Sequence, residues 1–382
     1  MGISRFSGRA PAAGVNPRRG TAIPPQAAAP SVEPEALVVS HWFDPGVEGE
    51  PYSATIRLSG RRVGISGPTR ASDTFVHDEA VDLIVPGSGP VSVSSWVYGL
   101  VPGDLSVSAE LIRRPSASDP LLAGRRAGRP GTEPLARAVW SWRRRKLSTG
   151  STEPLKTRWA ILAPVARIPG VVPGSFTVLA LLGFVVAAVI PWEILQRTGI
   201  GGSTSLVVSG FAIVVGVAGA KVWYRALHPD APIIGAGWAV DGFLVVAPLA
   251  GLAALYAFDL PIGQFLDASA PGLFAAVAIG RLGCFFTGCC AGRCTRHPLG
   301  IWSSDRRIGA RRIPTQLLES GAGLVIGVTA GILVLADAIV LHGAVFVVSL
   351  GVYLVVRQYL LRLRAEPRPF LWQRRTTGPL GS

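Results

Sequence analysis

The segment Gly170–Trp192 constrains the fold most, because it contains no Asp, Glu, Lys or Arg along its whole length. About 20 mainly apolar residues in a helix cross the hydrocarbon core of a bilayer. Five more segments of nearly that length follow: Leu206–Leu227, Ile233–Phe258, Ala268–Gly288, Ser320–Ala336 and Gly343–Leu361. We therefore expect an all-α polytopic membrane bundle of about six spans in the C-terminal half of the chain.

The overall composition agrees with a membrane protein. Charged residues make up 16% of the chain, below the ~25% that is usual in soluble domains, and hydrophobic residues make up 49%. The net charge of +14 is more typical of basic flanks beside anionic lipid than of nucleic-acid binding. No basic-and-aromatic module of the RNA-binding kind is present, so nucleic acid is not an expected partner.

The N-terminal part of the chain predicts a different architecture. Short runs that are β-branched or alternate between apolar and polar residues, separated by Gly, Pro and Asp, predict five strands: Leu37–Phe43, Tyr52–Leu58, Ala80–Ile84, Val91–Val97 and Leu105–Leu111. Residues 36–114 are therefore expected to form a small all-β sandwich-like domain, immunoglobulin- or fibronectin-like, that binds a partner protein or acts as a spacer.

The other segments are expected to lack a fold of their own. Residues 1–35 are rich in Ala, Pro and Arg, contain no apolar stretch of signal-peptide length, and are expected to be disordered. Residues 115–169 read as a basic linker that ends in an interfacial cluster of Trp and Arg. The membrane domain is expected over 170–364 and a basic tail over 365–382.

Six charged residues fall at membrane depth, where each is costly enough to suggest a function: Lys221, Asp241, Asp267, Arg281, Glu319 and Arg357. An equally good interpretation places Lys221, Asp267 and Glu319 near helix ends, where their charged groups reach the lipid headgroups. We call side A the membrane face at which Gly170–Trp192 begins.

The charged residues near side A are expected to form a pocket. Counting from the span ends puts Asp241, Arg281, Tyr353 and Arg357 at similar depths. Helical spacing places Tyr353, Arg357 and Arg364 on one face and Arg362 on the opposite face. Such a pocket is positively charged and suits an anionic headgroup, because arginine binds phosphate through two parallel hydrogen bonds.

Four blocks carry a family resemblance: Ala270–Arg293 (APGLFAAVAIGRLGCFFTGCCAGR), Arg312–Glu319 (RIPTQLLE), Gly219-Ala-Lys221 and Gly343–Arg364. In this order and spacing they resemble the bacterial prolipoprotein diacylglyceryl transferases over roughly 170–364. The resemblance implies a multi-pass protein of the bacterial cytoplasmic membrane. It also implies transfer of a diacylglyceryl group from phosphatidylglycerol to the lipobox cysteine of a prolipoprotein, which forms a thioether, with no cofactor.

The same resemblance implies roles for particular residues. The expected catalytic residues are Asp241, Arg281, Tyr353 and Arg357, with Arg281 and Arg357 holding the leaving phosphate. The expected substrate-binding residues are Gly242, Gly280, Gly283, Gly292, Gln316, Glu319 and Arg364.

Several positions depart from the family pattern. Asp241-Gly242-Phe243 stands where the family has His-Gly-Gly, Cys284 replaces an Asn, Leu318 replaces a Tyr, and six spans are expected where the family usually has seven. A carboxylate beside Arg281 is a weaker base than imidazole, and an Asp241–Arg281 ion pair that only joins two helices is a competing interpretation. The alternative function is therefore a non-catalytic relative that binds anionic phospholipid or a partner protein.

All four cysteines, Cys284, Cys289, Cys290 and Cys294, lie within one short stretch. The adjacent pair Cys289-Cys290 fits the usual spacing of zinc ligands poorly, so no metal is expected. A local disulfide or simple packing at a helix end are the other interpretations.

The distribution of basic residues bears on orientation. Side A carries most of the Arg and Lys that flank the spans, so the positive-inside rule places it in the cytoplasm. The family resemblance implies the opposite, an active site that faces outward, and the sequence leaves both orientations open.

Overall fold

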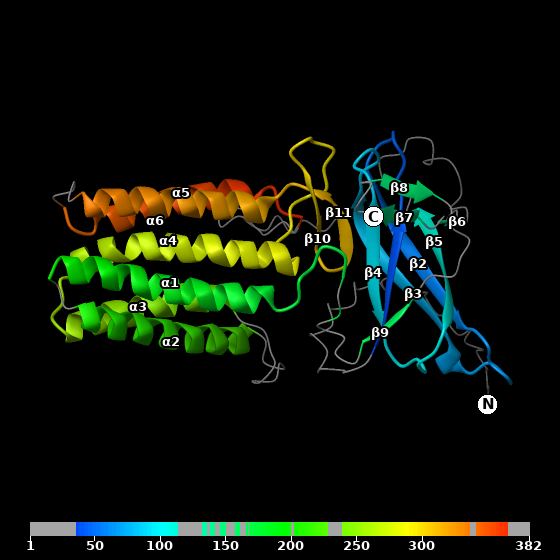
Figure 1. Ribbon diagram of the computed structural model, residues 1–382, viewed down its shortest axis with the longest axis horizontal. Coiled ribbons are helices and arrows are strands. Elements are labelled where there is room, and N and C mark those ends of the chain that lie inside the picture. Colours follow the sequence, from blue (N-terminus) through cyan, green and yellow to red (C-terminus); the bar gives the residue numbers. More distant parts are fainter. Residues whose placement is uncertain are drawn as a thin grey trace, which may run out of the picture.

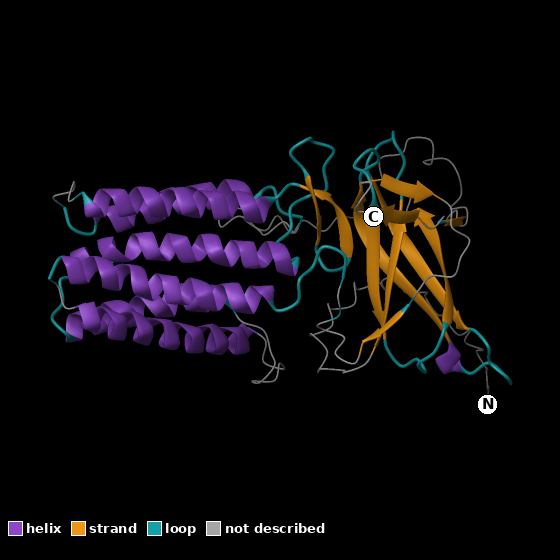
Figure 2. Cartoon of the chain, viewed as in Figure 1, coloured by secondary structure: helices purple, strands orange, loops and turns teal. Residues whose placement is uncertain are grey.

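The computed structural model describes residues 36–113, 132–135, 138–141, 146–149, 157–160, 166, 168–199, 202–227, 239–336 and 341–365. Within these ranges the chain forms a β region at one end and a bundle of long helices at the other (Figures 1 and 2). The expectations for residues 1–35 and for nearly all of the basic tail fall outside the described residues.

The β region contains each of the five strands that the sequence predicts: β1 (Ala36–Phe43), β2 (Tyr52–Arg62), β3 (Thr74–Ile84), β4 (Val91–Val97) and β5 (Leu105–Arg113). Alternation along β2 shows why this segment is a strand. Ile56 and Leu58 are fully buried in the β-region core, whereas Arg57 between them faces outward and pairs with Asp78. One face of each sheet thus supplies the core.

Two antiparallel sheets make up most of this region, in the orders β10-β11-β4-β1-β9 and β3-β2-β5-β6. Strands β10 (Ile301–Ser304) and β11 (Ile308–Arg312) come from much later in the chain. Four short strands come from the segment expected to be a linker: β6 (Thr132–Pro134), β7 (Ala138–Ser141), β8 (Lys146–Thr149) and β9 (Arg158–Ala160). Of these, β6 extends the sheet of β5 and β9 extends the sheet of β1, so the segment contributes directly to the β region.

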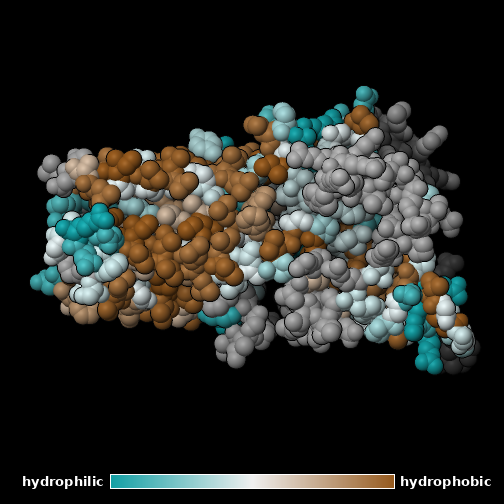
Figure 3. Space-filling model, in the orientation of Figure 1, coloured by the Kyte–Doolittle hydropathy of each residue, from teal (hydrophilic) through white to brown (hydrophobic). Residues whose placement is uncertain are grey.

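Six helices follow: α1 (Ser175–Arg197), α2 (Gly202–Leu227), α3 (Val240–Ala257), α4 (Ile262–Thr287), α5 (Thr315–Leu335) and α6 (Ala344–Leu361). Five of them are long and apolar enough to cross a membrane, and α3 is a shorter apolar helix. On the face shown in Figure 3, hydrophobic side chains cover much of the middle of the bundle. The predicted fold class, a helical membrane bundle preceded by a small β domain, is confirmed.

The helix starts that differ most from the expected boundaries are those of α3 and α4. The third span was expected from Ile233, but α3 begins at Val240, and residues 228–238 lie outside the described residues. The fourth span was expected from Ala268, but α4 already begins at Ile262 and continues through Pro271. A proline inside a membrane helix is tolerated where neighbouring helices cover it, and Pro271 is buried.

Helix α4 is central to the bundle, because it packs against α1 on one side and against α5 and α6 on the other (Figure 1). Small residues let the backbones approach closely. A Cβ at Gly272 would meet Pro191 and Ala187 of α1, and one at Gly323 would lie 3.1 Å from the Phe274 carbonyl oxygen of α4. Helices α2 and α3 pair with each other on the far side of α1.

The loop between α4 and α5 forms a hairpin that the sequence analysis did not predict. Its strands are β10 (Ile301–Ser304) and β11 (Ile308–Arg312). The latter pairs with β4, with Ile308 opposite Val93 and Gly309 opposite Ser92. A loop of the helical bundle therefore completes a sheet of the β region.

Candidate functional site

Glu319, one turn into α5, is the centre of a buried polar cluster. Its side chain is 1% exposed. Its Oε1 accepts hydrogen bonds from the Tyr353 hydroxyl (2.8 Å) and from Arg357 Nη1 (2.7 Å), and Arg281 Nη2 lies 3.0 Å away. Its Oε2 accepts from Arg364 Nη2 at 2.8 Å. We call these five side chains the arginine–glutamate cluster.

The five members come from α4, α5, α6 and the segment that follows α6. Arg281 lies on α4, and Tyr353 and Arg357 lie one helical turn apart on α6. Arg364 follows the end of α6, where the chain pairs with the segment after α4: the Arg293 amide donates to the Leu363 carbonyl (3.0 Å). Three helices therefore converge on one carboxylate at the side-A end of the bundle.

The cluster carries a formal charge of +2, since three guanidinium groups surround a single carboxylate. The side chains of Arg281 and Arg357 are 15% and 19% exposed, and that of Arg364 is 5% exposed. Charges held away from water in this way are rarely left uncompensated. Among the described side chains, Arg364 Nε is also buried without a hydrogen-bond acceptor. An anionic group would satisfy both the excess charge and this donor.

The first turn of α5 also holds the loop that follows α4. Gln316 Nε2 donates to the carbonyl of Cys289 (2.9 Å), and the Thr315 hydroxyl donates to the carbonyl of Cys290 (3.2 Å). A Cβ at Gly292 would overlap the carbonyl oxygen of Ile313. Gln316 and Gly292, both expected to bind substrate, thus have clear contacts within the protein itself.

The other glycines expected to bind substrate differ in their surroundings. Gly242 faces α2, where a Cβ would overlap Trp223. Gly283 faces α1, where a Cβ would lie 3.2 Å from the backbone of Phe176. Gly280 is different, because a Cβ there would meet no atom within 4 Å. Of these three, Gly280 alone leaves open space one residue before Arg281.

Asp241 is the second residue of α3, and its side chain is not among those that the structure describes. Helix α3 packs mainly on α2 and makes few contacts with α4. Among the described side chains, the carboxylate that Arg281 contacts belongs to Glu319. The depth argument that selected Arg281 also selects Glu319, which lies one turn inside α5, but depth does not show that the two side chains form an ion pair.

Asp267 lies at the opposite end of the bundle, near the start of α4. Its carboxylate accepts hydrogen bonds from the backbone amides of Gly343 (2.6 Å) and Phe346 (3.1 Å). These amides belong to the first turn of α6 and have no partner within the helix. Asp267 therefore caps α6.

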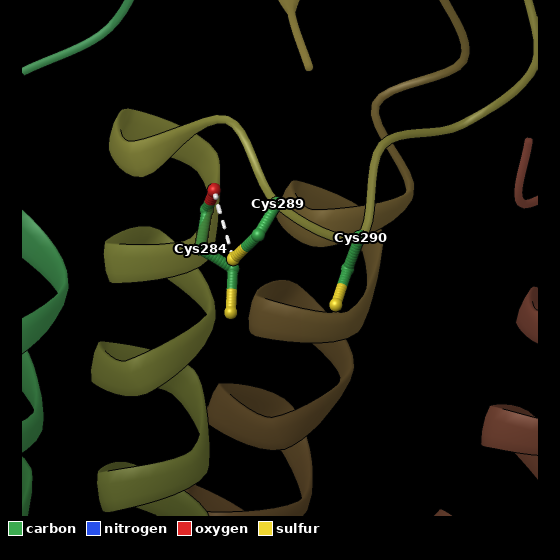
Figure 4. Close-up of side chains that lie close together, drawn as sticks. All are labelled: Cys284, Cys289 and Cys290. Atoms are coloured by element: carbon green, nitrogen blue, oxygen red, sulfur yellow. Dashed lines mark hydrogen bonds between the residues drawn. The ribbon is translucent and has the colours of Figure 1, made fainter. Parts of the chain in front are cut away.

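Three cysteines lie together beside the arginine–glutamate cluster. The sulfur atoms of Cys284, Cys289 and Cys290 are all within 4.8 Å of one another (Figure 4). Cys284 is on the last turn of α4, and the other two follow that helix. This is the one group of potential metal ligands found among the described residues.

Comparison with known proteins connects this architecture to a family. The family model described as prolipoprotein diacylglyceryl transferase matches residues 165–380. Relatives named phosphatidylglycerol–prolipoprotein diacylglyceryl transferase include one from Dehalococcoides mccartyi, 34% identical over 34% of this chain and 53% of its own length. The relative from Rhodopirellula baltica is 29% identical over 34% of this chain and 28% of its own length.

These alignments cover about a quarter to a half of the length of the two relatives. The family model extends further, over more than half of this chain, and includes all six helices and the whole arginine–glutamate cluster. The resemblance in the sequence blocks is thereby confirmed, and the chain belongs to the prolipoprotein diacylglyceryl transferase family.

Proposed function

We propose that this protein transfers a diacylglyceryl group from phosphatidylglycerol to the lipobox cysteine of a prolipoprotein in the bacterial cytoplasmic membrane. The observation that carries the proposal is the arginine–glutamate cluster, in which three guanidinium groups share one buried carboxylate. The two relatives described above are named for this activity. The surplus positive charge suits a phospholipid with an anionic phosphate.

In the proposed reaction, the cysteine thiol attacks the glyceryl carbon that carries the phosphate ester. A C–S bond forms and a C–O bond breaks, so the glycerol phosphate leaves with the bonding electron pair, while the thiol proton passes to a base or to the leaving phosphate. Arg281 and Arg357, the more exposed arginines of the cluster, hold the phosphate and stabilise the charge that develops on it.

The remaining cluster residues position this clamp. Glu319 holds the three arginines in place, and Arg364 contacts the carboxylate oxygen that the other two arginines leave free. The Tyr353 hydroxyl donates to Glu319 and so orients the same carboxylate. Gly280 leaves room for the headgroup next to Arg281. Gly242, Gly283, Gly292 and Gln316 support the site through packing and backbone contacts.

The thiol must lose its proton, because the thiolate is the nucleophile. Asp241 takes the family's His position and is our candidate for the base. A carboxylate is a weaker base than imidazole, so we expect the positive field of the cluster to contribute by favouring the thiolate.

The alternative, a relative that binds anionic phospholipid without transferring it, is favoured by the same substitution at Asp241. It predicts binding of phosphatidylglycerol without any product. The two functions are therefore separable in a single assay.

The test uses the full chain in liposomes that contain phosphatidylglycerol and a synthetic lipobox peptide. We expect the mass of the peptide to increase by one diacylglyceryl group, and we expect no product with phosphatidylcholine as the only lipid. Arg281→Ala and Arg357→Ala should each reduce the rate by at least ~100-fold. Arg362→Ala is the matched control, because Arg362 is exposed and lies over the Tyr359 ring, outside the cluster.

If phosphatidylglycerol binds but the wild-type protein never modifies the peptide, the transfer proposal fails and the binding alternative stands. Asp241→His then provides a second measurement. A gain of activity in that variant would locate the defect at the base.

A further inference from the structure

Three cysteine side chains lie close together where α4 ends. Cys284 projects from the end of α4, and the chain then turns back so that Cys289 and Cys290 approach it (Figure 4). Gly288 (φ 72°) and Cys290 (φ 56°) both adopt left-handed backbone conformations in this turn. Such a conformation is uncommon for a residue other than glycine and persists where the surroundings enforce it.

The surroundings of the turn provide that constraint. Thr315 and Gln316 hold the carbonyl groups of Cys290 and Cys289, and the Cys289 amide donates to the Cys284 carbonyl at 3.0 Å. These bonds fix the backbone on both sides of the Cys289-Cys290 peptide. Adjacent cysteines fit the usual zinc spacing poorly in sequence, but here the backbone directs both sulfur atoms to the same place.

We propose that Cys284, Cys289 and Cys290 bind a soft divalent cation, Zn²⁺, through their three thiolates. The sulfur atoms already lie within 4.8 Å of one another. With Zn–S bonds of ~2.3 Å in tetrahedral geometry, the sulfur ligands lie ~3.8 Å apart. Side-chain rotations that shorten the distances between the sulfur atoms by up to about 1 Å are therefore enough to form the site. This assignment replaces the expectation from sequence that the chain has no metal site.

Charge supports the assignment. A zinc ion with three thiolates carries a formal charge of −1, and the neighbouring arginine–glutamate cluster carries +2. The two groups are close, because Cys284 follows Arg281 by one turn of α4, and the carbonyls of Cys289 and Cys290 are held by residues one turn before Glu319. The cluster therefore compensates the thiolates that the metal requires, and the metal compensates part of the surplus charge of the cluster.

Three protein ligands leave a fourth position open. Structural zinc sites are usually closed by four protein ligands, whereas sites that act on an external group keep one position for water or substrate. The fourth position here faces no described His, Cys, Asp or Glu close enough to join the group. We infer that water or an external ligand completes the coordination.

The experiment measures metal in the full chain, purified in detergent without chelators. We expect about one zinc per wild-type chain by elemental mass spectrometry. After exchange with Co²⁺, we expect the intense absorption of a thiolate–cobalt complex. Cys289→Ser and Cys290→Gly should each reduce the bound metal at least ~10-fold. Glycine suits the left-handed position of residue 290, so this variant removes the sulfur without straining the turn.

Cys294→Ser is the matched control. Cys294 is only four residues after Cys290, but it packs against the core of the β region and is not part of the group. It should retain the zinc and the cobalt spectrum of the wild type. Thermal unfolding of each variant, with and without a chelator, separates loss of the site from loss of the fold: the chelator should lower the melting temperature of the wild type and of Cys294→Ser but not that of Cys290→Gly.

Two results would overturn the proposal. One is a wild-type chain that binds no zinc or cobalt when all its thiols are free. The other is a loss of two free thiols per chain without metal, which would identify a disulfide instead. Neither readout depends on the transfer reaction, so this proposal can fail while the proposed function stands.

Discussion

Trp42 of β1 and Trp302 of β10 stack on each other, with ring centroids 5.3 Å apart and planes inclined by 16°. The indole N–H of Trp302 also donates to the Pro90 carbonyl at 3.2 Å. The two rings belong to parts of the chain that the sequence assigns to different domains. Together with the β4–β11 pairing, this stack fixes the β region against the side-A end of the helical bundle (Figure 1).

Trp302→Ala should loosen this junction. The variant loses the stacked pair, worth about 0.5–1.5 kcal/mol beyond simple burial, and the hydrogen bond to Pro90. We expect a lower melting temperature in detergent and faster proteolysis of the β region, while the helical content by circular dichroism stays the same. Val76→Ala is the control, because Val76 is 68% exposed on β3. Equal proteolysis of both variants would contradict a role for the stack.

Glu319→Gln should destabilise the bundle strongly. The variant leaves one buried and two partly buried guanidinium groups without their common anion, and breaking a buried ion pair from one side costs about 3–5 kcal/mol. We expect a clear fall in the melting temperature of the detergent-solubilised protein. The effect should be smaller when anionic lipid is present, because its phosphate can replace the carboxylate partly.

Glu193→Gln is the matched control for this measurement. Glu193 pairs with Arg197 at 2.7 Å one turn along α1, but its side chain is 47% exposed. Exposed pairs of this kind contribute only ~0.3–0.5 kcal/mol. A loss of stability in Glu193→Gln as large as in Glu319→Gln would mean that burial of the cluster is not what makes its ion pairs important.

The contrast between the spans and the α4–α5 loop shows how far sequence predicts this molecule. The sequence reliably predicts a membrane helix in uncharged segments such as Gly170–Trp192, because a long apolar segment in a bilayer has few alternatives to a helix. Helical spacing correctly placed Tyr353 and Arg357 on one face of α6, since both contact Glu319. Arg364 contacts the same carboxylate but lies beyond the end of α6, so helical spacing does not explain its position. The β10–β11 hairpin was missed because its pairing partner, β4, lies some two hundred residues earlier. Local sequence patterns do not indicate a pairing between segments so far apart.

Depth does not identify which carboxylate an arginine contacts. Depth alone grouped Asp241 with Arg281, and among the described side chains the carboxylate that contacts Arg281 is that of Glu319. The choice depends on which helices are neighbours, and α5 packs against α4 while α3 packs on α2. Helix adjacency is a property of the assembled bundle, which single-span periodicity does not contain.

Asp267→Ala should destabilise α6 from its first turn. The change removes the acceptor for two backbone amides, and loss of such a cap costs about 0.5–2 kcal/mol. Asp267→Asn keeps an acceptor oxygen and should recover most of that stability. Thermal unfolding and amide hydrogen exchange at Gly343 and Phe346 measure the effect. Similar exchange rates in the Ala variant and the wild type would show that the cap does not hold the helix end.

Gly292→Ala tests the close contact that joins the loop after α4 to the start of α5. A methyl group at this position would overlap the carbonyl oxygen of Ile313, which belongs to the backbone and cannot rotate away. The loop must then move, and with it the pairing of Gly292 with Arg364. We expect lower thermal stability and weaker binding of phosphatidylglycerol, because Arg364 is displaced from Glu319.

Gly321→Ala is the matched control, since a Cβ there meets no atom within 4 Å and alanine favours a helix by up to ~1 kcal/mol. Gly321→Ala should therefore be at least as stable as the wild type, and a Gly292→Ala protein with unchanged stability and lipid binding would show that Arg364 keeps its place without this contact.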